Sequence, residues 1–265
     1  MFSSDAGWRV KLDRAVELLP QVSVAITDFI SSHPYKVSIQ KDTQTGRFFA
    51  NVTLTAEPPP RLSAMVGEVI HNQRSSLALL INHLICQVSA PSRSTEFPIC
   101  DSPTAFRSYQ KNGRLDPKCG LAKIDVLGQS IKDAVEQLQP YQNPSNPLWV
   151  LHNLNNLDKH RDLIAVGTPV GMVQISLIGS GDSFHGMRLP GWNPAQGPLR
   201  QGSLLLSWDM GYGPPDLSVT RKVRPSLDVV FGQADPSAGR PVIQTLEGIT
   251  VFIRDRVFTV LEPYA

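Results

Sequence analysis

The chain has 265 residues, of which 41% are hydrophobic, so it can form a core and is not disordered throughout. At this length we expect one large domain or two small ones. Because 25 Lys and Arg face 23 Asp and Glu, the net charge of +2 excludes a polyelectrolyte as the dominant partner. The composition requires no broad basic face, so any contact with RNA or DNA must be local.

The N-terminal part, residues 1–62, predicts a helix followed by a β-hairpin. Apolar residues recur with helical spacing from Val10 to Ile30, and Pro20 is expected to kink or split this helix. Side chains then alternate along residues 35–41 and 47–55, on either side of a turn that contains Gly46. This pattern is typical of two antiparallel strands.

The middle part, residues 63–165, predicts a helical bundle. Apolar side chains fall on one face of residues 63–89, which give the strongest helical signal in the chain. A second helix is predicted for residues 121–139 and a third for residues 147–165, where Asn146 and Pro147 form a favourable start.

The last part, residues 166–265, predicts strands and a terminal helix. The strands are expected at residues 170–178, 203–208 and 226–231, and the helix follows Pro241. Because only loops separate these strands, an antiparallel sheet is favoured over a parallel one. The predicted fold class is α+β, a helical bundle with an N-terminal hairpin and a C-terminal antiparallel sheet plus helix, whose three parts are either separate or built on one core.

Two polar clusters lie beside the apolar stripes of the helices at residues 63–89 and 147–165. The first contains Glu68, His71, Asn72 and Arg74, and the second contains Asn156, Asp158, His160 and Arg161. If the two stripes pack together, the clusters meet. An arginine that points at a core needs a carboxylate, which Asp158 or Glu68 could supply to Arg161.

Two interpretations of these clusters remain open. In the structural one, a satisfied network fixes the register of the two helices through Asn72, Asn156, Asp158 and Arg161. In the chemical one, Arg74 and Arg161 hold a phosphodiester, and His71 or His160 moves a proton. Buried polar groups are normally paired for structural reasons, which favours the first interpretation.

Other signals concern the environment of the protein and its cofactors. The longest apolar run, residues 77–81, is too short to cross a membrane, and the N-terminus has no secretory signal. The three cysteines include no Cys-x-x-Cys pair, so no disulfide framework or thiolate zinc site is expected. We therefore expect a cytoplasmic protein with no membrane segment, no metal and no cofactor.

Four short motifs resemble a widespread family of bacterial proteins of unassigned function. They are His71-Asn-x-Arg-Ser-x-Leu77, Phe97-Pro-Ile99, Gln139-Pro-Tyr141 and Asn155-Asn-x-Asp-Lys-His-Arg161. The resemblance covers most of the chain and is weakest in the C-terminal third. In many relatives the helix that corresponds to residues 63–89 contains Arg-x4-His. This spacing is similar to the signature of HEPN domains, the helical nucleotide-binding modules of higher eukaryotes and prokaryotes.

The resemblance implies a HEPN-like helical bundle and two alternative functions. Many HEPN proteins are metal-independent ribonucleases whose Arg and His meet at a dimer interface. Here Arg74 matches the arginine, but Leu79 replaces the histidine, and His83 lies about 6 Å further along the helix. The resemblance therefore implies a degenerate, non-catalytic module that pairs with a second copy or associates with RNA. The alternative is a metal-independent endoribonuclease of the toxin or phage-defence type.

Overall fold

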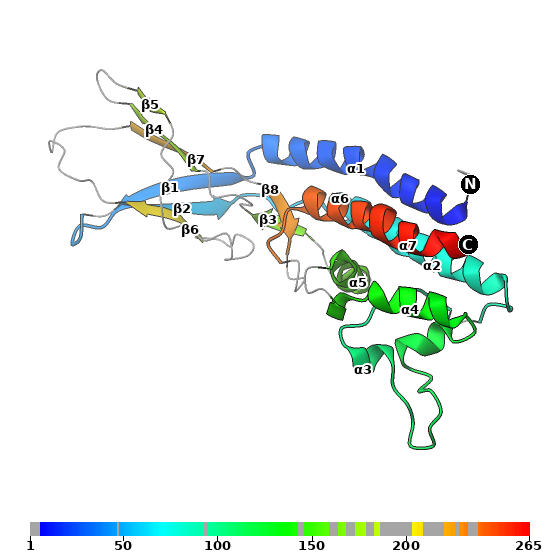
Figure 1. The fold of residues 1–265 in the computed structure, drawn as a ribbon. Helices are drawn as coiled ribbons and strands as arrows, with labels where there is room; N and C mark the ends of the chain where they lie inside the picture. Colours follow the sequence, from blue (N-terminus) through cyan, green and yellow to red (C-terminus); the bar gives the residue numbers. More distant parts are fainter. Residues whose placement is uncertain are drawn as a thin grey trace.

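Long helices form one end of the molecule and strands form the other (Figure 1). The computed structural model describes residues 6–46, 48–92, 95–142, 146–158, 164–167, 173–178, 183–185, 203–208, 220–225, 228–232 and 238–265. Within these ranges the predicted α+β class is confirmed.

Helix α1 (Gly7–Ser31) is continuous, so Pro20, which was expected to kink or split it, does not split it. Proline at this position removes the backbone hydrogen bond to the carbonyl of Val16. Both Pro20 and Val16 are exposed, so water can satisfy that carbonyl, while the buried face of the helix continues past the proline. The predicted hairpin is confirmed as strands β1 (Tyr35–Lys41) and β2 (Phe48–Leu54), which pair antiparallel.

Helix α2 (Pro60–Cys86) matches the strongest helical prediction and is the central element of the bundle. Helix α1 runs antiparallel to it: the ring of Trp8 packs against that of His83, and Lys11 reaches Asn72. The side chains that α2 buries include Val66, Ile70, Leu77, Leu80, Ile81 and Leu84, as the apolar periodicity predicts.

The helix predicted for residues 121–139 is two separate elements, so this prediction was wrong. The structure has a 3-10 turn at Gly120–Ile124 and helix α4 at Gln129–Gln137. Gly128 has an extended backbone and caps α4, its carbonyl accepting from the amides of Ile131 and Lys132. The apolar side chains keep a helical period across this interruption, which is why the sequence pattern did not reveal it. The short helix α3 (Pro103–Phe106) lies upstream.

Helix α5 (Pro147–Leu157) begins where Asn146 and Pro147 predict, but it ends about eight residues before the predicted end. The prediction extended this helix to residue 165, with Ile164 on its apolar face, whereas Ile164–Gly167 forms strand β3. This strand pairs antiparallel with β8 (Asp228–Phe231), whose Val229 and Phe231 are buried. Pairing with a distant strand therefore overrides the local helical spacing.

The strands predicted in the C-terminal third are present and antiparallel, but they belong to three sheets. Strand β6 (Ser203–Trp208) extends the N-terminal hairpin by pairing with β2. Strand β4 (Val173–Ile178) lies between β5 (Ser183–His185) and β7 (Thr220–Pro225) in the second sheet. Strands β3 and β8 form the third.

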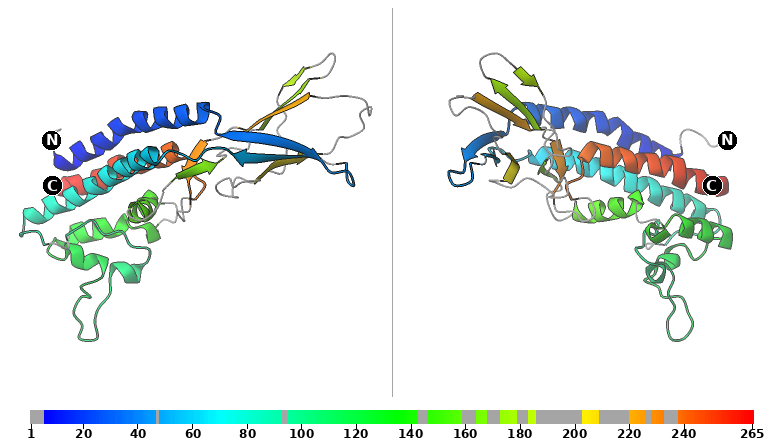
Figure 2. Two further views of the ribbon diagram at one scale, coloured as in Figure 1. Left: turned by 180° about the vertical axis from the view of Figure 1, so that it is seen from behind. Right: turned by 60° about the vertical axis from the view of Figure 1, so that its left-hand side comes forward.

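The predicted terminal helix is confirmed and returns alongside α1 and α2 (Figure 2). It consists of α6 (Val242–Phe252), a π-helical turn at Ile253–Phe258, α7 (Thr259–Leu261) and a final 3-10 turn at Glu262–Tyr264. Trp8 Nε1 donates to Glu262 Oε1 over 3.0 Å, which ties the start of α1 to the end of the chain. One hydrophobic cluster draws buried residues from α1, α2, α4, α5, β8 and α6. Within the described residues, no helix has the length and hydrophobicity to cross a membrane.

Candidate functional site

Arg74 of α2 contacts a segment of the chain that is distant from it in sequence. Its side chain is only 13% exposed, and Nη2 donates to the Phe97 carbonyl oxygen at 2.9 Å and to Glu96 Oε2 at 3.2 Å. The buried Nη1 has no hydrogen-bond partner among the described residues. Burial lowers the pKa of Arg74 and the charge of Glu96 opposes this shift, so the guanidinium remains charged. Arg74 thus joins α2 to residues 96–100.

Glu96 connects Arg74 to a second cation. Lys123, from the 3-10 turn before α4, donates to the other carboxylate oxygen of Glu96. Burial alone would raise the pKa of Glu96, but the hydrogen bond and charge of Lys123 and the charge of Arg74 outweigh it and lower the pKa. Glu96 is therefore an anion shared between two cations, and its side chain remains 44% exposed.

His152 of α5 faces the same group of charges. Its ring stacks on that of Trp149, with centroids 5.5 Å apart, and its Nε2 accepts from the Asn156 amide at 3.1 Å. Burial, and next the positive charge of Arg74, lower the pKa of His152, so the imidazole is neutral at pH 7. We call Arg74, Glu96, Lys123 and His152 the Arg74 cluster.

Residues 96–100 are held from their other side by Gln139, which is fully buried. Its Oε1 accepts from the Cys100 amide at 2.9 Å, and its Nε2 donates to the carbonyl oxygens of Pro98 and Val135, both at 3.0 Å. Three of the motifs that carry the family resemblance, those around Arg74, Phe97 and Gln139, therefore meet at this extended segment. Their polar side chains satisfy backbone groups that helices and sheets leave unpaired.

The other predicted residues of α2 lie outside the Arg74 cluster. Asn72 faces α1, because its Oδ1 accepts from Lys11 Nζ at 3.4 Å and its Nδ2 donates to the Glu68 carbonyl at 2.8 Å. Glu68 and His71 are exposed, and the His71 ring lies 3.4 Å from the Ser75 hydroxyl. Residues 72 and 74 point about 200° apart around a helix, so they contact different neighbours. The structure thus does not join Asn72 to Asn156, which bonds to His152 instead.

Helices α2 and α5 pack against each other, and they cross: Figure 1 views α5 nearly end-on while α2 runs across the view. An added Cβ on Gly67 would lie only 2.3 Å from Oδ1 of Asp158, which caps the end of α5, while His152 in the middle of α5 is near enough to Arg74 for the guanidinium charge to lower its pKa. The middle of α5, not its end, therefore lies toward Arg74. The predicted His160 and Arg161 lie outside the described residues.

The positions that distinguish this chain from the HEPN signature face α1. Leu79 is 37% exposed, and a Cβ on Gly7 would lie 3.8 Å from its Cδ1. His83 packs against Trp8, with ring centroids 4.7 Å apart, and its Nε2 lies 3.4 Å from the Gln87 amide. Neither side chain is directed at Arg74, because residue 79 lies about 140° from residue 74 around the helix.

Sequence reasoning missed Glu96, Lys123 and His152. Glu96 lies in an irregular segment, where periodicity carries no signal, and Lys123 lies in a 3-10 turn that the sequence pattern merged into the helix predicted for residues 121–139. His152 lies in α5, one turn before Asn156, but only the way α5 crosses α2 brings it toward Arg74.

Comparisons with known proteins assign no family or function to this arrangement. Models of protein families, curated proteins and solved structures all gave no match to the chain. In the part of the chain that the structure describes, no three His, Cys, Asp or Glu side chains gather as metal ligands would. The chemistry of the site therefore rests on its own residues, two cations, one shared carboxylate and a neutral imidazole.

Proposed function

We propose that the chain is a non-catalytic, HEPN-like helical interaction module that associates with nucleic acid. One observation carries the non-catalytic part: the Arg74 guanidinium is bound inside the protein by Glu96 and the Phe97 carbonyl. A ribonuclease arginine must instead present its donors to a phosphate. Releasing Arg74 would leave both of these partners without its hydrogen bonds.

The contact with nucleic acid would be local and electrostatic. Lys123 has a side chain 31% exposed, and together with Arg74 it leaves one net positive charge beside Glu96. A single accessible cation supports weak, salt-dependent association with a phosphate backbone rather than reading of a base sequence. Pairing with a second copy of the chain, as the HEPN resemblance implies, would double this charge.

One observation favours the alternative function, a metal-independent endoribonuclease. His152 is a neutral imidazole close enough to Arg74 for the guanidinium to lower its pKa, and a neutral imidazole is the form that a general base requires. In this alternative Arg74 and Arg161 hold the phosphate. The general base is His152, His71 or His160.

Incubating the purified protein with structured RNA in EDTA distinguishes the two functions. For the non-catalytic module we expect intact RNA at every protein concentration, and a retarded RNA–protein complex at low salt that Lys123→Gln weakens. RNA cleavage that disappears in His152→Ala, His71→Ala or His160→Ala would instead establish the enzyme.

Lys118→Gln is a matched control, since Lys118 is exposed and lies in the turn just before Lys123. It should leave RNA retardation unchanged. Equal loss of binding in the Lys118 and Lys123 variants, or no RNA binding at low salt, would contradict the proposed association.

A further inference from the structure

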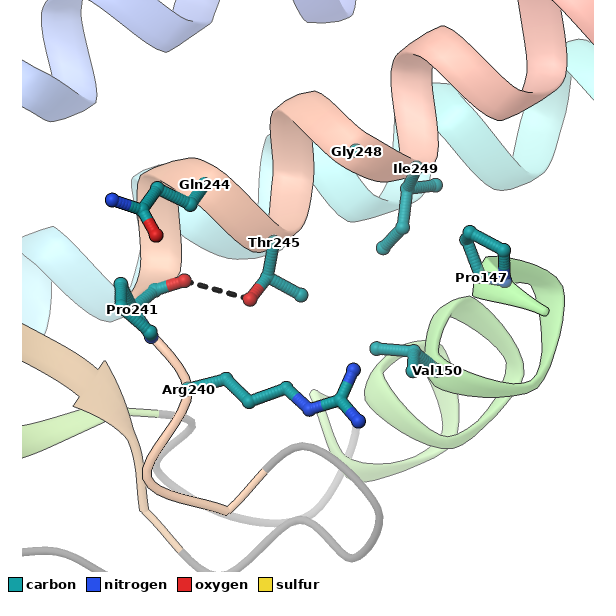
Figure 3. A pocket seen from close by; sticks show the side chains of 8 residues that line it. All are labelled: Pro147, Val150, Arg240, Pro241, Gln244, Thr245, Gly248 and Ile249. Atoms are coloured by element: carbon teal, nitrogen blue, oxygen red, sulfur yellow. Dashed lines mark hydrogen bonds between the residues drawn. The ribbon is translucent and has the colours of Figure 1, made fainter. Parts of the chain in front are cut away.

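A pocket lies between α5 and the start of α6, apart from the Arg74 cluster (Figure 3). Its volume is about 270 Å³. This is close to the lower end of the roughly 300–1,000 Å³ typical of small-molecule sites. Eight described residues line it: Pro147, Val150, Arg240, Pro241, Gln244, Thr245, Gly248 and Ile249.

The inner wall of the pocket is apolar. Val150 and Ile249 are buried, at 6% and 1% exposure, and they approach the pocket from α5 and α6 respectively. Thr245 adds its methyl group, because its hydroxyl donates to the Pro241 carbonyl oxygen at 2.7 Å and points away from Val150 (Figure 3). A ligand body in this space would therefore contact hydrocarbon.

Arg240 supplies the one charge among the described residues of the lining. Its side chain extends from two residues before α6 toward α5, and its guanidinium lies beside Val150 (Figure 3). Arg240 is exposed, and none of the ion pairs or side-chain hydrogen bonds between described residues involves it. A guanidinium next to an apolar wall suits an anionic group joined to an apolar body.

Gly248 keeps this space open. It lies within α6, where glycine destabilises a helix by about 1 kcal/mol relative to alanine. Its backbone does not require glycine, because its φ is not positive, and an added Cβ would meet no described atom within 4 Å. A larger side chain at this position would instead project into the pocket that Gly248 lines.

We propose that this pocket binds a small organic carboxylate with an apolar body, the carboxylate paired with Arg240 and the body against Val150, Thr245 and Ile249. One guanidinium balances the single charge of a carboxylate and matches its two oxygens with two parallel N–H donors. A phosphate dianion would require further donors, and Arg240 is the only cationic residue in the described lining.

Binding of benzoate by the full chain, followed by ligand-observed NMR at low salt, tests the proposal. Benzamide has the same ring without the charge, and acetate has the charge without the ring. We expect benzoate to bind, and both analogues to bind at least about tenfold more weakly. Absence of benzoate binding up to about 10 mM, well above a weak ~1 mM affinity, would overturn the proposal.

Three variants locate the site. Arg240→Gln should weaken benzoate binding about tenfold or more, and Gly248→Leu should abolish it by filling the pocket, with the fold retained because leucine favours a helix. Arg254→Gln is the matched control, as Arg254 is an exposed arginine outside the pocket lining, and it should bind benzoate as the wild type does. Unchanged binding in Arg240→Gln, or equal weakening in Arg254→Gln, would show that benzoate binds elsewhere and would overturn the proposal.

Discussion

The two arginines that border α5 differ in what holds their guanidinium groups. Arg74 is 13% exposed and donates to Glu96 and to the Phe97 carbonyl. Arg240 is exposed, and no ion pair between described residues involves it. The first was the prominent residue in the sequence, and the second stood out only once the pocket was seen.

This difference separates a structural cation from one that can meet a ligand. A buried guanidinium that satisfies backbone and carboxylate groups contributes to folding, and removing it leaves those groups unpaired. A guanidinium at the edge of an apolar pocket loses only solvent when an anion binds. Four substitutions, apart from their controls, and one pH titration test which side chains contribute to folding. They follow in order of decreasing expected effect.

Arg74→Ala should have the largest effect, lowering the free energy of unfolding by about 3 kcal/mol. This is the lower end of the range for breaking a buried ion pair, because Glu96 is partly exposed and keeps Lys123. Urea unfolding measures the change. Arg240→Ala is the control and should stay within about 0.5 kcal/mol of the wild type. Equal effects of the two substitutions would erase the proposed distinction.

Gln139→Leu should lower the free energy of unfolding by about 2 kcal/mol, because it leaves the Cys100 amide and the Pro98 carbonyl without their partner. Gln137→Leu makes the same change at an exposed position two residues earlier, and its effect should be within about 0.5 kcal/mol. If Gln139→Leu left the free energy of unfolding unchanged, residues 96–100 would not depend on the hydrogen bonds of Gln139.

Two helical glycines should respond to alanine with opposite signs. At Gly67 the new methyl group would displace the Asp158 carboxylate, so the net loss of stability should be about 1 kcal/mol. At Gly248 no described atom is in the way, and alanine should raise stability by roughly 0.5–1 kcal/mol. Thermal unfolding of both variants measures the signs, and stabilisation by Gly67→Ala would show that α2 and α5 do not pack this closely.

The pH dependence of stability should show a small contribution from His152. Burial and the Arg74 charge lower the pKa of His152 in the folded protein, so the unfolded chain binds more protons near its ordinary value of ~6.5. This contribution is full above that pH and is lost as the pH falls from about 7 to about 5. In urea unfolding across this range, His152→Gln should lose less stability than the wild type. An unchanged pH dependence would mean that burial and the Arg74 charge do not lower the pKa of His152.

The sequence predicted most helices and strands because their signals are local. Helix α2 follows from its apolar periodicity, and the hairpin follows from alternation around Gly46. The wrong predictions lie where a distant partner or a single cap decides the outcome. Ile164 fits a helical stripe but pairs with Phe231, and Gly128 interrupts a stripe that continues on both sides of it.

The candidate site could be predicted only in part, for a similar reason. Arg74 stood out as a polar residue beside an apolar stripe, but its partner Glu96 lies in an irregular segment that no periodicity places. Lys123, the second partner of Glu96, lies in a 3-10 turn that the sequence pattern merged into a longer helix. His71, three residues before Arg74, was expected to act together with it, but the His71 side chain is exposed and lies outside the Arg74 cluster. The pocket at Arg240 depends on how α5 meets α6, and a sequence pattern does not contain that geometry.

A double-mutant cycle between Arg74 and Glu96 tests most directly whether Arg74 is bound inside the protein. The free energies of unfolding of Arg74→Ala, Glu96→Ala and the double variant give the coupling between the two side chains. We predict a coupling of about 1 kcal/mol, within the usual range for neighbours in one network. Additive effects, with a coupling below about 0.3 kcal/mol, would contradict this account, because Arg74 would then be free to meet a phosphate.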